Sequence, residues 1–218
     1  MNVDENREAD AELQRLGVPR VPAVVVEDRA VHGWNPPAYA RLLGVAYQET
    51  ARFTPGELAT RLDRVLECTE RLLRIVPDAQ LGFTPPERDR TLRQLGHHVF
   101  RLSLAFVDAV DHGTLPSTWL NEAAPAQIDG AAALAAYGAL VRARLAGWFA
   151  GAGADEYRRT VETYYGPQSA RDLLERTTWH AAQHLRQLHD LAARVGVVPP
   201  DPLPTDAFKG LPMPDALW

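Results

Sequence analysis

Four long stretches of the chain carry apolar residues at every third or fourth position, which is the period of an amphipathic helix. The spacing predicts helices over about 54–75, 91–112, 131–150 and 169–196. The signals at the ends agree, since Thr54 and Glu57 form a capping box and Gly113 follows the second stretch as a stop. Four helices of about 20 residues predict a mainly α protein, built as a four-helix bundle.

Long connections join these predicted helices. They span 77–90, 113–129 and 151–168 and are rich in proline, glycine and polar residues, which is typical of functional loops. Six prolines follow Val197. The final segment, 197–218, is therefore predicted to be extended and to lie over the bundle.

The N-terminal part mixes helix and strand signals. Helix formers over 4–16 end at Gly17, and a β-branched run over 21–26 is followed by a second candidate strand, 29–34, across a tight turn. Pro36 opens a further helix that stops at Gly44. This α-β-β-α piece is too small to bury a good core alone. The predicted organisation is a small α/β segment, a bundle and a tail, at 1–45, 50–196 and 197–218.

Composition excludes several classes of protein. The chain has 28 acidic and 23 basic residues without a basic block, which argues against nucleic-acid binding. No apolar run approaches a membrane span of about 18 residues, and the N-terminus is acidic, unlike a signal peptide. The single cysteine, Cys68, excludes a disulfide framework and is predicted to be a small buried residue. These features predict a cytoplasmic protein.

Helical geometry sorts the histidines of the second and fourth helices. His98 lies at the edge of the apolar stripe of the 91–112 helix, next to the bundle interior. His97 falls nearly opposite and is predicted to face solvent or a loop. His180 and His184 are four residues apart, so they stack on one edge of the buried face of the 169–196 helix. His32 and His112 lie near turns and are predicted at the surface.

Two imidazoles from one helix and one from a facing helix supply three nitrogen ligands for a divalent metal. Such a site leaves positions open for water or substrate, as catalytic sites do. Histidines at this spacing also occur as ordinary hydrogen-bonded core residues. The glutamate of the zinc-protease pattern is absent, because Ala181 and Ala182 follow His180. On spacing alone, both interpretations stay open.

The same residues carry a resemblance. Thr91 precedes His98 by seven residues, and Thr178, His180 and His184 follow on the fourth helix. This pattern resembles the DinB-like superfamily, which includes mycothiol-dependent maleylpyruvate isomerases and thiol S-transferases, over about residues 50–195. The resemblance implies a metal site. Its ligands would be His98, His180 and His184.

The N-terminal segment resembles the second half of a glutaredoxin. In that fold the pair matching Val21 and Pro22 is a cis-proline turn that presents backbone to a bound thiol, and the pair matching Gly33 and Trp34 closes the same edge. The first strand, first helix and Cys-x-x-Cys are absent, so thiol–disulfide exchange is not expected. Either the chain has lost that half, or the gene begins upstream of Met1.

The resemblances imply a divalent-metal-dependent enzyme that transfers a low-molecular-weight thiol to a small electrophile, or catalyses a thiol-assisted isomerisation. Zinc is the default ion for imidazole ligands, with nickel and iron(II) as alternatives. The other hypotheses are a non-catalytic metal-binding, structural or stress-response module, and a hydrolase that uses metal-bound hydroxide.

Further residues receive weaker interpretations. Tyr164 and Tyr165 are candidate hydrogen-bond donors to the substrate, or simply aromatic residues that cover the open end of the bundle. Gln183 is predicted to point away from the core and receives no role, and Arg101 is predicted to be a solvated surface residue. The alanine-rich stretch 131–136 would allow a homodimer.

Overall fold

The computed structural model describes residues 6–18, 23–33, 35–47 and 52–218. These residues fall into two units. The smaller one contains the described residues up to 52 together with 162–167, and the larger one contains the rest of 53–218.

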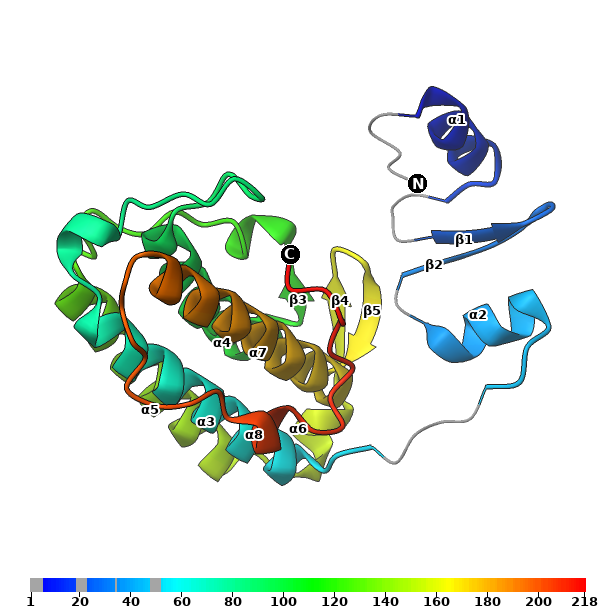
Figure 1. The fold of residues 1–218 in the computed structure, drawn as a ribbon. Coiled ribbons are helices and arrows are strands. Elements are labelled where there is room, and N and C mark those ends of the chain that lie inside the picture. The colour runs from blue at the N-terminus through cyan, green and yellow to red at the C-terminus, as the bar shows by residue number, and fades with distance from the viewer. Residues whose placement is uncertain (1–5, 19–22, 34, 48–51) are drawn as a thin grey trace. The chain divides into compact units, whose positions relative to one another are not determined.

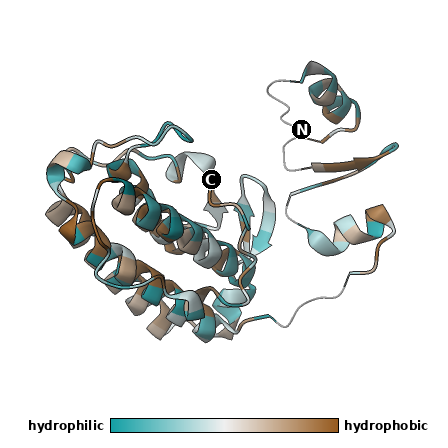
Figure 2. Cartoon of the chain, viewed as in Figure 1, coloured by the Kyte–Doolittle hydropathy of each residue, from teal (hydrophilic) through white to brown (hydrophobic). Residues whose placement is uncertain are grey.

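The larger unit is a bundle of four long helices (Figure 1). Its helices are α3 (Pro55–Ile75), α4 (Leu92–His112), α5 (Ala131–Gly151) and α7 (Ala170–Arg194). Helices α3 and α4 each pack mainly against α5 and α7. The apolar faces of the four helices form one continuous core, and Figure 2 shows apolar and polar residues alternating along the bundle helices. The bundle predicted from the apolar spacing is confirmed.

The helix ends lie within a few residues of the predicted positions because their caps are local. The side chains of Thr54 and Thr91 each close a capping box, with Glu57 and Gln94 as partners. Helix α4 ends at Gly113, whose φ of 74° lies in the left-handed region that glycine adopts without strain. Helix α5 is different, since its first N–H, of Ala131, is bound by the carboxylate of Asp78 from a remote part of the chain, at 2.8 Å.

The segment 151–168 is not the loop that its composition predicts. It contains α6 (Ala154–Arg158) and a hairpin of β4 (Thr160–Thr163) and β5 (Gly166–Ser169). With β3 (Thr114–Leu115), the hairpin forms a small sheet of order β3-β4-β5. Burial alternates along β4 over four residues only, and β5 (Gly-Pro-Gln-Ser) has no β-branched residue that would mark it as a strand.

Short helices complete the larger unit. Two 3₁₀ helices, η2 (Asp78–Gln80) and η3 (Ser117–Trp119), lie in the connections before and after α4. The final segment holds α8 (Thr205–Phe208) and contacts the bundle, where Asp201 pairs with Arg71 of α3 at 3.0 Å. None of the helices in the described ranges is both long and apolar enough to cross a membrane.

The smaller unit has the α-β-β-α order that the sequence predicts. Its elements are α1 (Arg7–Arg15), β1 (Ala23–Val26), β2 (Arg29–His32) and α2 (Pro36–Leu43). The strands pair antiparallel, with Val26 opposite Arg29 across a two-residue turn. Asn6 and Asn35 cap the two helices with their side-chain oxygens.

Candidate metal centre

Three histidines from two facing helices converge inside the bundle. His98 comes from α4, and His180 and His184 come from successive turns of α7. One ring nitrogen of each lies within 4.8 Å of the others. The ring centroids are 4.9 Å apart for His98 and His184 and 4.6 Å apart for His180 and His184. Helical spacing and the packing of α4 on α7 therefore bring together the three residues that the sequence singled out.

Hydrogen bonds fix two of the imidazole rings. Nδ1 of His98 donates to the backbone carbonyl of Leu120 at 2.8 Å, and Nδ1 of His184 donates to Oε1 of Gln187 at 2.7 Å. Carbonyl oxygens only accept, so each Nδ1 carries the proton and each Nε2 keeps its lone pair. This arrangement of the outer nitrogen is the one that metal-binding histidines adopt.

The Nε2 atom of His184 is buried and has no hydrogen-bond partner among the described residues. A buried polar atom without a partner costs roughly 1–3 kcal/mol. Coordination of a cation would satisfy it. The donor set also suits a divalent ion such as zinc, for which neutral imidazole is a common ligand. The residues of the cluster thus fit a metal ion.

Burial keeps all three histidines neutral. Desolvation, reinforced by the charge that the other histidines would carry, lowers the pKa of His98 to about 3 and that of His180 well below its usual value. Desolvation lowers the pKa of His184 to about 4, and the hydrogen bond to Gln187 opposes this shift. Arg90 also lowers all three pKa values by its positive charge. At neutral pH each imidazole is therefore in the form that binds a cation.

No carboxylate or thiol joins the cluster within the described parts of the chain. Without an anionic protein ligand among the described residues, a divalent ion held there would keep its full double charge. Such a centre attracts anionic ligands.

Two predictions about α4 were wrong. His97 is 3% exposed and stacks on Tyr137 of α5, with the ring centroids 5.2 Å apart. Arg101 is also buried and pairs with Glu122 at 2.6 Å and with Asp108 at 3.1 Å. A single apolar stripe implies one buried face, but α4 packs on α5 as well as α7, and the connection after α4 brings Glu122 over Arg101.

Gln183, to which the sequence analysis gave no role, is buried. Its amide donates to the carbonyls of Ala216 and Leu217 at 3.1 and 2.7 Å. The final segment of the chain covers this face of α7, which no helical pattern reveals. The sequence analysis missed Gln187 for the same reason. The available signal was a polar residue one turn after a candidate ligand on a buried face.

The other residues that the sequence analysis predicted as site residues are not among the three converging histidines, and some of them lie outside the described residues. Tyr164 and Tyr165 form the turn between β4 and β5 and contact each other edge to face, at 4.9 Å between ring centroids. Their catalytic role stays a prediction. Gly33 is buried with a φ of 76°, and a side chain there would collide with the backbone carbonyl of Tyr165. The other predicted thiol-binding residues, Val21, Pro22 and Trp34, lie outside the described residues.

Three other side chains lie where the sequence placed them. Cys68 is buried, and desolvation raises the pKa of its thiol, so it is a poor nucleophile. His32 and His112 are exposed.

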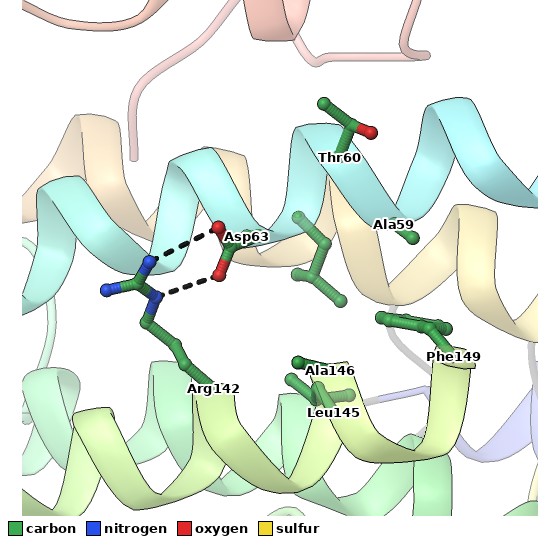
Figure 3. A pocket seen from close by; sticks show the side chains of 8 residues that line it. Ala59, Thr60, Asp63, Arg142, Leu145, Ala146 and Phe149 are labelled. Atoms are coloured by element: carbon green, nitrogen blue, oxygen red, sulfur yellow. Dashed lines mark hydrogen bonds and ion pairs between the residues drawn. The ribbon is translucent and has the colours of Figure 1, made fainter. Parts of the chain in front are cut away.

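A groove of about 290 Å³ lies between α3 and α5 and is separate from the histidines (Figure 3). Arg142 spans it with a two-point ion pair to Asp63, at 2.9 and 3.2 Å. Its remaining lining is mostly apolar, from Leu62, Leu145 and Phe149 among others. The groove contains no histidine, and its guanidinium is already paired, so it adds nothing to the centre.

Comparison with solved structures identifies the same fold. A DinB-like protein from Bacillus subtilis, YjoA, matches with a TM-score of 0.53 and 13% identity, over 65% of this chain and 93% of its own. YfiT from Bacillus subtilis matches with a TM-score of 0.53 and 16% identity, over 71% of this chain and 96% of its own. YfiT is described as a probable metal-dependent hydrolase with an unusual four-helix bundle topology.

No curated protein matches the chain by sequence. The family model of the DinB superfamily matches residues 61–188, which cover most of the four long helices and all three converging histidines. The chain therefore belongs to the DinB superfamily.

Proposed function

We propose that the protein is a divalent-metal-dependent enzyme whose ion is held by His98, His180 and His184. The observation that carries the proposal is the convergence of three neutral imidazoles, of which those of His98 and His184 are buried and that of His180 is partly exposed. His184 leaves its Nε2 without a partner among the described residues. An ion held by three imidazoles supplies a nucleophile at neutral pH, because it lowers the pKa of a thiol or water that binds to it.

The chain's own residues prepare the centre. The carbonyl of Leu120 and the amide of Gln187 hold the protons of His98 and His184 on Nδ1, so that each Nε2 keeps its lone pair. Desolvation lowers the pKa of His98 and of His184 and so keeps both rings uncharged. The positive charge of Arg90 favours an anionic ligand beside them.

The reaction that we propose is transfer of a low-molecular-weight thiol to a small electrophile, or a thiol-assisted isomerisation. A centre without a protein carboxylate or thiolate, as found in the described residues, favours binding of an external thiol as its anion. Zinc is the ion we expect, with nickel or iron(II) as alternatives. The description of YfiT favours a second candidate, a hydrolase that uses water in place of a thiol.

The N-terminal segment enters this proposal as a glutaredoxin-like segment that binds a thiol near Gly33. Its α-β-β-α order and the left-handed backbone of Gly33 support that assignment. A homodimer through α5 is part of the same proposal, because this helix exposes Leu140, 70% accessible, on its outer side.

The first test is the metal content of the purified protein, measured by elemental analysis after reconstitution. We expect about one divalent ion per chain in the wild type and loss of the ion in His98→Ala and His180→Ala, because each removes a nitrogen ligand. His112→Ala is the matched control. This variant should keep the ion, because His112 is exposed. Full metal content in the first two variants, or none in the wild type with zinc, nickel or iron(II), would refute the proposal.

Thiol dependence separates the two reactions. The metal-loaded protein is assayed with 1-chloro-2,4-dinitrobenzene and glutathione or cysteine, and with p-nitrophenyl acetate without a thiol. In thiol transfer a sulfur–carbon bond forms, chloride leaves and the thiol proton passes to solvent. Turnover that needs the thiol and disappears in His184→Ala supports the transferase, and ester cleavage without a thiol supports the hydrolase.

A further inference from the structure

The face of α7 next to the histidines holds the final segment of the chain, residues 214–218. Gln183 donates to the carbonyls of Ala216 and Leu217, and Gln187 donates to the carbonyl of Leu217 at 2.8 Å. The guanidinium of Arg186 binds the carbonyl of Pro214 at 2.8 Å. The segment is therefore fastened to α7 through its backbone.

The last residue adds two side-chain contacts. The indole N–H of Trp218 donates to Asp190 at 3.2 Å, and the guanidinium of Arg194 lies 5.6 Å from its ring centroid. Both partners come from α7, so the whole of 214–218 follows one helix.

The side-chain amide of Gln187 forms one hydrogen bond with this segment and another with His184 of the centre. Its Nε2 donates to Leu217, and its Oε1 accepts from Nδ1 of His184 at 2.7 Å. An amide has one donating and one accepting end. Because the carbonyl of Leu217 can only accept, it fixes which end of Gln187 faces His184. The accepting end then requires the proton of His184 on Nδ1, which leaves Nε2 free for a cation.

The two fixed histidines differ in what holds them. Nδ1 of His98 donates directly to a backbone carbonyl, that of Leu120. Nδ1 of His184 depends on a side chain whose orientation is set 30 residues away. If Gln187 turned over, its NH₂ group would face Nδ1, the tautomer would reverse and Nε2 would carry the proton. His184 is therefore the ligand whose state depends on the final segment.

We propose that Gln187 is a positioning residue, and that residues 214–218 are the anchor that makes it hold His184 in its metal-binding tautomer and orientation. The consequence for affinity rests on the proposed metal function. Removal of such an outer partner of a ligand typically lowers metal affinity about 10–100-fold.

Zinc affinity tests the coupling in a double-mutant cycle, by competition with a chromophoric chelator. The proteins are the wild type, Gln187→Leu, a chain that ends at Met213, and the combination of both changes. We expect each single change to weaken zinc binding about 10–100-fold. The truncation should add little in the Gln187→Leu background, because the anchor acts through this one side chain.

Gln187→Glu provides a second, independent variant. Its carboxylate still accepts from Nδ1 of His184 but cannot donate to Leu217, so zinc affinity should be kept and should no longer depend on truncation. Ser103→Ala is the control for loss of a buried hydrogen bond, since that hydroxyl donates to the carbonyl of Val99 on its own helix. Its zinc affinity should be unchanged. Circular dichroism confirms that each variant is folded.

Two outcomes would overturn the inference. One is wild-type zinc affinity in the truncated chain. The other is a truncation effect of the same size in wild type and in Gln187→Leu.

The tautomer itself can be measured without metal, which separates this inference from the proposed function. Long-range ¹H–¹⁵N correlation spectra of the metal-free protein are expected to show the proton of His184 on Nδ1, with the signal assigned from its absence in His184→Ala. Truncation at Met213 should convert part of this signal to the other tautomer. An unchanged signal refutes the positioning role even if zinc binds, and a changed signal supports it even if zinc does not.

Discussion

The imidazoles of His98, His180 and His184 are neutral at pH 7 because a positive charge on any of them would lie inside the bundle, away from water. The charge that one protonated ring would place beside the others adds to this effect. The unfolded chain has no such restriction, and its histidines titrate near pH 6.5. The folded state therefore binds fewer protons than the unfolded state below that pH.

This difference predicts acid sensitivity of the metal-free protein. The three pKa values are depressed on folding, so their contribution to stability is present above pH 6.5 and is lost as the pH falls toward 3 to 4. Between pH 7 and pH 5 we expect a loss of about 2 kcal/mol per histidine in the free energy of unfolding. Urea titrations at both pH values measure it.

A variant provides the control for this prediction. In His98→Phe one titrating group is gone, so the loss between the two pH values should be smaller by about one histidine's share. An equal loss in both proteins would show that other groups cause the acid sensitivity.

Local periodicity predicted which three histidines converge, but not the residues that form hydrogen bonds with them. The stripe of α4 placed His98 at the interior, and the four-residue spacing placed His180 beside His184. His97 was misjudged because a stripe names only one buried face. The position of Gln187 one turn after His184 was visible in the sequence, but its orientation was not, because the carbonyl of Leu217 that orients its amide is 30 residues away.

At the level of helices and strands, the sequence predicts those helix ends whose capping residues lie within one turn of the end. The capping boxes at Thr54 and Thr91 and the stop at Gly113 set the ends of α3 and α4. The cap that Asp78 provides for α5 depends on tertiary contact and has no local signal. The hairpin of β4 and β5 was missed because β5 is Gly-Pro-Gln-Ser, without the β-branched residues that mark the equally short β1.

Helix α5 approaches α4 closely through Gly138. A Cβ at this position would overlap the buried ring of Phe100. Gly138→Ala is therefore expected to lower the free energy of unfolding by about 1–3 kcal/mol, although alanine is the better helix former. Chemical denaturation measures the change.

Gly147 is the matched control on the same helix. It is exposed, and no atom lies within 4 Å of a Cβ placed there. Gly147→Ala should stabilise the protein by up to about 1 kcal/mol through helix propensity alone. Stabilisation by both substitutions would mean that α4 and α5 do not meet at Gly138.

In the molecule as a whole, the buried apolar residues that stabilise the bundle all belong to the bundle unit itself. The large buried apolar cluster has members from Leu58 to Leu211 in the sequence, and all three histidines of the centre fall within that range of residue numbers. Helices α3, α4 and α7 were predictable because each carries its own apolar stripe. Helix α5 has no such stripe and was predictable from its alanine content, because alanine is the strongest helix former. The position of the final segment on α7 was not, because it is held by side chains that bind backbone carbonyls, and such contacts leave no periodic pattern.

Residues 53–218 expressed alone are therefore expected to fold. We predict a melting temperature within about 5 °C of the full chain and the same metal content, since the apolar cluster and the histidines are retained. Thermal circular dichroism and elemental analysis test this. An unfolded fragment would mean that the N-terminal residues contribute to the stability of the bundle.

The hydrogen-bond path from Leu217 through Gln187 to His184 has a thermodynamic consequence. Coupling between two binding events is reciprocal. The free energy that docking of residues 214–218 adds to ion binding is the same free energy that a bound ion adds to docking of the segment. A protease that cleaves only the undocked segment would then act on empty protein in preference to loaded protein. Whether residues 214–218 are still present after exposure to such a protease would then show whether the protein had bound its ion.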